Sequence, residues 1–188
     1  AELQERDLSV LFLDIGGYTG LCERLGHAVV HDIIEKHFSV FMHAIYANNG
    51  DVNETAGDGL MVLFLNEDQK GSALDAVRTA LSIREQTLRL KDECAMLYRP
   101  LDINMGINSG TALVGAAKFE SLIGSRWTYT ARGTLTNVAA RISALGSKGT
   151  LLMSKTTAGR VQGVFSPVSR GMHKLKNVSE EVEVFEIK

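Results

Sequence analysis

The sequence contains few of the residues that interrupt or cross-link a chain, since its 188 residues include two prolines and two cysteines. So few prolines leave little room for a disordered linker, and residues 1–188 are expected to fold throughout as one domain. Cys22 and Cys94 lie far apart and form no CxxC pair, so neither a disulfide framework nor a zinc site is indicated. This cysteine usage fits a reducing, cytoplasmic setting.

The sequence also lacks a surplus of charge of either sign, with a formal net charge of −2. Nucleic acids and anionic lipids normally require an excess of Lys and Arg, so neither is expected as a partner. No apolar run approaches the roughly 20 residues of a membrane-spanning helix, and there is no signal-peptide pattern. Direct membrane contact by this segment is therefore not expected. The start at Ala1 indicates a longer parent protein, which could carry a membrane or sensor domain.

The hydrophobic pattern predicts strands and helices that interleave along the chain. Three-and-four spacing of apolar residues predicts helices, and short apolar or alternating runs predict strands. The expected helices cover residues 29–45, 73–90 and 135–145. The expected strands cover residues 9–13, 51–55, 60–65, 101–107, 113–115, 127–130, 150–153 and 182–187. This order predicts an α+β or α/β layered domain.

Two aspartates lie beside glycines at the ends of predicted strands. Asp14 follows the predicted strand 9–13, and Asp58 lies in the turn between the predicted strands 51–55 and 60–65. Magnesium is usually held by one or two carboxylates together with substrate phosphates, so such a pair suits a nucleotide-metal site. Taken alone, either aspartate is better explained as a capping or turn residue, because Asp favours turns through local hydrogen bonds. The spacing by itself leaves both interpretations open.

Two further segments contain candidate binding residues. The turn Gly16-Gly17-Tyr18-Thr19 could offer backbone N–H groups to a phosphate, although it matches neither the P-loop nor the dinucleotide pattern. Asn137 and Arg141 are four residues apart, so they share one face of the predicted helix. There they could stabilise charge on a transferring phosphoryl group. Taken alone, that pair is better explained as part of a solvated helix face.

Taken together, these segments resemble the catalytic domain of the class III adenylyl and guanylyl cyclases. The resemblance rests on three motifs in the family's order, at residues 12–19 (Phe-Leu-Asp-Ile-Gly-Gly-Tyr-Thr), 57–61 (Gly-Asp-Gly-Leu-Met) and 133–141. Residues 106–110 and 175–177 are also similar to family landmarks. The joint occurrence of these motifs is far more specific than any one of them.

This resemblance implies a ferredoxin-like, palm-type βαββαβ core with extra strands and helices. It implies an enzyme that converts GTP or ATP into the 3′,5′-cyclic monophosphate and pyrophosphate by attack of the ribose 3′-hydroxyl. Two Mg²⁺ or Mn²⁺ ions would be held by Asp14, Ile15 and Asp58. Asn137 would orient the ribose, and Arg141 would neutralise charge at the α-phosphate.

The resemblance also implies a shared site in a dimer. Lys176 would bind the terminal phosphates, together with the backbone of the Gly16–Thr19 turn. Members of the family act as head-to-tail dimers, in which the metal aspartates of one protomer face the Asn, Arg and Lys of the other, and a homodimer of this chain would have two equivalent sites. Dimerisation is then a natural point of control by an attached regulatory domain.

Base selection in the family maps to Glu54 and Thr130 in this sequence. A carboxylate at Glu54 can accept hydrogen bonds from guanine N1–H and the N2 amine, but also from the adenine N6 amine. The hydroxyl of Thr130 can donate or accept, so it does not decide between the bases. The mixed pair leaves both nucleotides open and favours GTP. The alternative for Glu54 is a solvent-facing hairpin residue.

A second departure is Asn104, at a position where many relatives have an arginine that helps to hold phosphate. Without a bidentate cation there, triphosphate binding could be weaker or depend on Arg126 or Lys118. This keeps open a catalytically quiet homologue that serves as a dimerising or nucleotide-sensing module. A related palm-type phosphotransferase, such as a dinucleotide cyclase, would instead be expected to show a GGDEF-like hairpin.

Overall fold

The computed structural model describes residues 3–54, 59–94, 101–121 and 124–188. The helices are α1 (Tyr18–Leu25), α2 (His27–Ala47), α3 (Gln69–Cys94), α4 (Thr134–Leu145) and α5 (Lys155–Val161). The strands are β1 (Gln4–Gly16), β2 (Gly50–Glu54), β3 (Gly59–Phe64), β4 (Asp102–Ser121), β5 (Gly124–Arg132), β6 (Leu151–Ser154), β7 (Val168–His173) and β8 (Val182–Ile187).

The strands form one eight-stranded sheet in the order β2-β3-β1-β4-β6-β8-β7, with β5 paired to β4 outside this path. β1 lies between β3 and β4 and is antiparallel to both. The core order β2-β3-β1-β4, with α2 before β2 and α3 after β3, is the ferredoxin-like arrangement. The predicted α+β fold is therefore confirmed.

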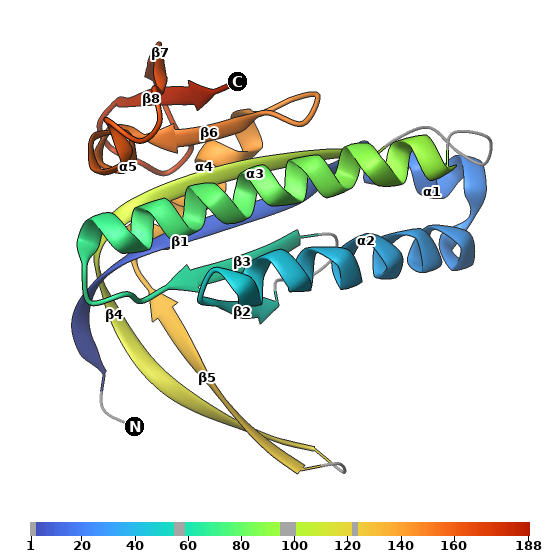
Figure 1. Ribbon diagram of the computed structural model, residues 1–188, viewed down its shortest axis with the longest axis horizontal. Coiled ribbons are helices and arrows are strands. Elements are labelled where there is room, and N and C mark those ends of the chain that lie inside the picture. Colours follow the sequence, from blue (N-terminus) through green and yellow to red (C-terminus); the bar gives the residue numbers. More distant parts are fainter. Residues whose placement is uncertain (1–2, 55–58, 95–100, 122–123) are drawn as a thin grey trace.

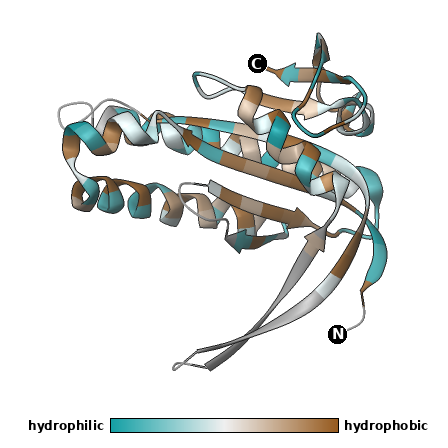
Figure 2. Cartoon of the chain, turned by 180° about the vertical axis from the view of Figure 1, so that it is seen from behind, coloured by the Kyte–Doolittle hydropathy of each residue, from teal (hydrophilic) through white to brown (hydrophobic). Residues whose placement is uncertain are grey.

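The sheet carries helices on both faces (Figure 1). Alternate side chains of β1 explain this, because successive residues of a strand point to opposite faces. Leu11 and Leu13 belong to the core beneath α2 and α3, whereas Leu8 and Val10 pack with residues of α4 on the other face. Figure 2 shows the corresponding hydrophobic colouring of the central strands.

β4 is one long strand, although the sequence pattern predicted two short ones at residues 101–107 and 113–115. The prediction was wrong because it took the polar stretch between them as a break. In the structure, Asn108 Nδ2 donates to the carbonyl of Leu135 over 3.2 Å, and the hydroxyls of Ser109 and Ser9 lie 2.7 Å apart. These buried polar groups are hydrogen-bonded, so the strand continues through them. The outer part of β4 and β5 projects from the sheet as a long hairpin (Figure 1).

Helix α4 packs unusually close to β4 at Gly106. A Cβ atom at this position would lie 2.3 Å from the backbone nitrogen of Ser143 and 2.8 Å from the carbonyl oxygen of Ala139. Only glycine allows such an approach of helix backbone to strand backbone. Gly106 therefore fixes the height of α4 above the sheet.

Two further features concern the cysteines and the helices. Cys22 is a buried free thiol, and the side chain of Cys94 lies outside the described part of the chain. Among the described residues, none of the helices combines the length and the apolar character needed to cross a membrane.

Candidate functional site

Asp14 lies at the end of β1, on the face of the sheet that α4 covers. In the strand register it pairs with Gly59 of β3 and with Asn104 of β4. Its carboxylate is half-buried, and the hydroxyl of Ser143 on α4 donates to Oδ1 over 3.3 Å. The sheet and α4 together thus hold an acidic oxygen at a strand end, where a hard cation could be coordinated.

Of the other two predicted metal residues, Ile15 lies in the described part of the chain and Asp58 does not. Asp58 lies outside the described residues, but the next residue, Gly59, is the one paired with Asp14. The side chain of Ile15 is 3% exposed and belongs to the core beneath α2 and α3. Ile15 can therefore offer only its main-chain carbonyl to an ion. Among the described residues, no group of three or more His, Cys, Asp or Glu side chains is placed to hold a metal ion.

The predicted glycine turn joins β1 to α1. β1 ends at Gly16, and Gly17 adopts a left-handed conformation with φ 75° before α1 begins at Tyr18. A non-glycine residue would be strained at that φ. The amide of Leu21 donates to the carbonyl of Gly17 over 3.0 Å, and no side chain caps this helix start. Thr19 is exposed in the first turn.

Asn137 and Arg141 lie on the face of α4 that points away from the sheet. The opposite face buries Leu135, Val138 and Ile142 against the strands and the loop before β8. Asn137 is exposed and Arg141 is half-buried. The two side chains are therefore presented together, as the four-residue spacing predicted.

The start of α4 is set by Gly133. This residue has φ 121°, which favours glycine, and its carbonyl accepts from the hydroxyl of Thr136 over 3.0 Å and from the amide of Asn137 over 3.4 Å. The sharp entry into the helix places Asn137 one turn from its start. The position of Asn137 thus depends on a backbone conformation that few other residues tolerate.

Lys176 is presented by a tight turn between β7 and β8. Asn177 has a positive φ of 63°, and the ammonium group of Lys174 donates to the carbonyls of Val178 and Ser179 over 2.8 and 2.6 Å. Leu175 is 2% exposed and packs with residues of the sheet-facing side of α4. This anchor leaves Lys176 exposed next to α4.

The predicted residues thus divide into two sets. Asn137, Arg141 and Lys176 are displayed around the outer side of α4, whereas Asp14 lies beneath its inner side at Ser143. Within one chain, Asp14 and the pair Asn137 and Arg141 therefore lie on different sides of α4.

For the two predicted base-selecting residues, the structure describes the backbone and not the side chain. Glu54 is the last residue of β2 and pairs with Leu60, and Thr130 in β5 pairs with Gly115 of β4. Their side chains lie outside the described part of the chain, as do those of Lys118 and Arg126.

Asn104 has a structural role in this chain. It is 6% exposed, and its Oδ1 accepts a hydrogen bond from the amide of Gly149 over 3.1 Å. The buried amide therefore holds the loop before β6 rather than facing an open phosphate site. The functional position that sequence reasoning missed is Ser143, which contacts Asp14. The sequence feature that could have indicated Ser143 is Gly106, because a glycine within a strand allows another backbone, here that of α4, to approach closely.

Comparisons with known proteins agree with this arrangement. A family model described as the adenylate and guanylate cyclase catalytic domain matches residues 2–188. The crystal structure of the adenylyl cyclase CyaB from P. aeruginosa is similar with a TM-score of 0.87 and 27% identity, covering 100% of this chain and 96% of that one. The guanylyl cyclase Cya2 has the same fold, with a TM-score of 0.87 and 24% identity over 99% of this chain and 93% of that one.

The curated relatives are longer proteins. An adenylate cyclase from Anabaena cylindrica is 26% identical over 97% of this chain, which spans 37% of that protein. An adenylate cyclase from Dictyostelium discoideum is 25% identical over 74% of this chain, and the matched part is 6% of that protein.

Proposed function

Because the chain belongs to the adenylate and guanylate cyclase catalytic domain family, we propose that residues 1–188 form one catalytic domain that cyclises GTP or ATP. The ribose 3′-hydroxyl loses its proton to solvent and its oxygen attacks the α-phosphorus. The bond from that phosphorus to the bridging oxygen of the β-phosphate breaks, and pyrophosphate leaves. The observation that supports this most directly is the pairing of Asp14 with Gly59, the residue next to Asp58.

The family uses divalent metal ions, and the donor set of this chain suits them. Asp14 supplies a carboxylate at a strand end and Ile15 a main-chain carbonyl, which are the oxygen ligands that Mg²⁺ and Mn²⁺ prefer. We assign two ions to Asp14, Ile15 and Asp58. When bound, such ions lower the pKa of the attacking hydroxyl and neutralise phosphate charge.

The remaining roles belong to the outer side of α4, to the turn at Lys176 and to the Gly16–Thr19 turn. Asn137 orients the ribose by hydrogen bonds, and Arg141 stabilises the charge that develops around the α-phosphate. Lys176, anchored by the buried Leu175, binds the terminal phosphates as a point charge. The backbone of the Gly16–Thr19 turn contributes N–H donors to the phosphates.

These roles require two chains arranged head to tail. Asp14 lies under α4 while Asn137 and Arg141 are displayed on its outer side, so one protomer would supply the acids and its partner the amide and the guanidinium. The dimer would have two equivalent sites. Because this chain spans 37% and 6% of two curated relatives, we also propose an attached regulatory domain. A cytoplasmic location of the catalytic domain is part of the same proposal.

Base choice is assigned to Glu54 and Thr130, and we rank GTP before ATP because a carboxylate can accept two hydrogen bonds from guanine. The experiment is incubation of the purified chain with Mn²⁺ and either nucleotide, followed by identification of the product. We expect cyclic GMP to exceed cyclic AMP. The matched control is Asp14→Asn, which keeps the size of the side chain and removes its charge.

A catalytically quiet homologue is the second candidate, because Asn104 is buried and bonded to Gly149 at the position where many relatives have an arginine that helps to hold phosphate. In that case the folded chain would bind nucleotide or dimerise but yield no cyclic product with either base. Product formed equally by Asp14→Asn would contradict the first proposal.

A further inference from the structure

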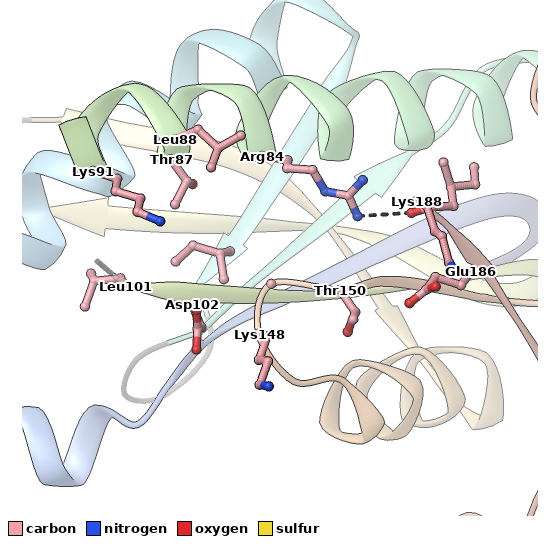
Figure 3. A pocket seen from close by; sticks show the side chains of 13 residues that line it. Arg84, Thr87, Leu88, Lys91, Leu101, Asp102, Lys148, Thr150, Glu186 and Lys188 are labelled. Atoms are coloured by element: carbon pink, nitrogen blue, oxygen red, sulfur yellow. Dashed lines mark hydrogen bonds between the residues drawn. The ribbon is translucent and has the colours of Figure 1, made fainter. Parts of the chain in front are cut away.

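A cleft of about 390 Å³ is shown with its lining side chains in Figure 3, and no described residue of α4 lines it. It is bounded by the second half of α3, the start of β4, the loop before β6 and the end of β8. Its apolar lining includes Leu101, Ile103 and Ile187, which are 6%, 2% and 8% exposed. A cleft of this size with an apolar wall suits a small organic molecule.

Among the described residues, the charged side chains that line this cleft are mainly positive. Arg84, Lys91, Lys148 and Lys188 line it, against Asp102 and Glu186. The carboxylate of Glu186 already forms an ion pair with Arg170 of β7. Lys91 and Lys148 are exposed and form no ion pair with any described residue.

Arg84 is the most enclosed of these cations. Its Nη2 donates to the carbonyl of Ile187 over 3.1 Å (Figure 3). Burial lowers the pKa of Arg84 from its ordinary value, and the nearby Glu186 partly offsets this effect. A guanidinium keeps its charge at neutral pH even so. The cleft therefore holds a fixed positive charge beside its apolar wall.

The cleft is also connected to Asp14. Gly149 lines the cleft, and its amide donates to Asn104 Oδ1 over 3.1 Å. Asn104 pairs with Asp14 in the strand register. The hydroxyl of Ser143 lies 3.3 Å from Oδ1 of Asp14 and 3.4 Å from the carbonyl oxygen of Asn104. A ligand that orders the loop at Gly149 thus acts on the strand pair that holds Asp14.

We propose that this cleft binds a small organic anion with a compact apolar body, and that its occupancy stabilises the strand end at Asp14 through Gly149 and Asn104. The anionic group contacts Lys91 and Lys148, and the apolar body covers Leu101 and Ile103. None of Asn137, Arg141 and Lys176 lines this cleft, so its occupant is an effector distinct from the nucleotide proposed to bind those residues.

The test uses the full chain and 1-anilinonaphthalene-8-sulfonate, an apolar anion whose fluorescence rises in an apolar site. Titration is done in EDTA, so that the result is independent of metal and of turnover. We expect Lys91→Glu and Lys148→Glu each to weaken binding by about fivefold or more, since each reverses a charge at the cleft. The matched control is Lys70→Glu, an exposed lysine on the same helix α3 that does not line the cleft.

Hydrogen exchange with and without the probe locates the site and tests the connection. We expect slower exchange in peptides that contain residues 101–106, 146–151 and 13–16 in the natural chain, and loss of this protection in Lys148→Glu. Protection elsewhere, or equal weakening by Lys176→Glu, overturns the cleft as the site. Protection at 146–151 without change at 13–16 overturns the connection to Asp14. Neither result depends on cyclase activity, so failure here is distinct from failure of the proposed function.

Discussion

The hydroxyl of Ser143 on α4 donates a hydrogen bond to the carboxylate of Asp14 on β1, although 129 residues separate them in the chain. The bond is possible because Gly106 lets the helix backbone descend onto β4. It orients one oxygen of the carboxylate proposed to bind metal, as outer-sphere hydrogen bonds do at metal sites.

Ser143→Ala should therefore raise the metal concentration that activity requires, and should lower turnover at saturating metal much less. We expect the Mn²⁺ concentration for half-maximal cyclase activity to rise about tenfold, because the carboxylate loses its orienting donor. The measurement is a metal titration at fixed nucleotide. Ser147→Ala, an exposed serine just after the same helix, should match the natural chain. An unchanged metal requirement in Ser143→Ala would contradict a positioning role.

Gly106→Ala should destabilise the fold. Its Cβ would meet the backbone of α4 at 2.3 Å, so the helix must move, at a cost of about 3 kcal/mol in the free energy of unfolding. Gly159→Ala is the matched control, because nothing lies within 4 Å of that added Cβ in α5. It should be neutral or stabilising by up to about 1 kcal/mol. Denaturant titration measures both, and equal stability of the two variants would disprove close packing at Gly106.

Complementary inactive variants should restore activity when mixed. Asp58→Ala and Arg141→Ala each lose a different half of the proposed shared site, so a mixed dimer has one intact site. Random exchange at equal amounts should yield about a quarter of the natural activity. Mixing Asp58→Ala with Asp14→Ala should restore none, because both changes affect the same half. Absence of rescue between folded, exchanging dimers would argue against shared sites.

The ion pair between Arg160 of α5 and Asp7 of β1 should contribute measurable stability. It is bidentate, with N–O distances of 2.7 and 2.8 Å, and its side chains are 17% and 21% exposed. Arg160→Lys should lower the free energy of unfolding by about 1 kcal/mol, because one ammonium cannot reproduce the paired geometry. Arg89→Lys changes an exposed pair with Glu85 and should have almost no effect. If both variants lost the same free energy of unfolding, the bidentate geometry of the Arg160–Asp7 pair would contribute no stability of its own.

His37 should make stability depend on pH. Its Nδ1 lies 2.7 Å from the carbonyl oxygen of Ile33, and burial lowers its pKa below the ordinary 6.5. His37 therefore binds a proton more readily in the unfolded chain than in the folded one. The contribution of neutral His37 to the free energy of unfolding is complete above pH 6.5. This contribution is lost as pH falls through the folded-state pKa, by at most about 1.4 kcal/mol per pH unit.

Denaturant titrations between pH 7.5 and 5 test this. His37→Gln should show a shallower loss of unfolding free energy on acidification than the natural chain. His43→Gln, which removes an exposed histidine of the same helix, should retain the natural slope. Parallel curves for all three proteins would rule out His37 as the source.

The sequence alone predicted the long periodic elements and the order of the motifs, but not the elements with weak patterns. α5 was missed because it has seven residues, although Ser154 caps it by accepting from the amide of Thr157 over 3.3 Å. β7 was missed because it is an edge strand with almost no buried side chains. α1 was missed because the predicted helix began only after Gly26, whose φ of 82° separates α1 from α2. Short and exposed segments leave little hydrophobic pattern to read.

The placement of candidate residues was predictable where a motif specifies a strand end or a helix face, as for Asp14 and for Asn137 with Arg141. Their functional roles stay predictions. The role of Asn104 could not be predicted in this way. Its hydrogen bond to Gly149 links positions 45 residues apart, and no local pattern indicates such a contact. The same holds for Ser143, which reads in sequence as an ordinary helical residue.

Helix α4 contacts β4 through its inner side and displays Asn137 and Arg141 on its outer side. Both sides belong to one rigid body of 12 residues, so the helix cannot slide or tilt on β4 without displacing the two polar side chains as well. In the proposed head-to-tail dimer, mutations where the inner side of α4 packs on β4 should consequently alter the geometry of the substrate bound by the neighbouring protomer.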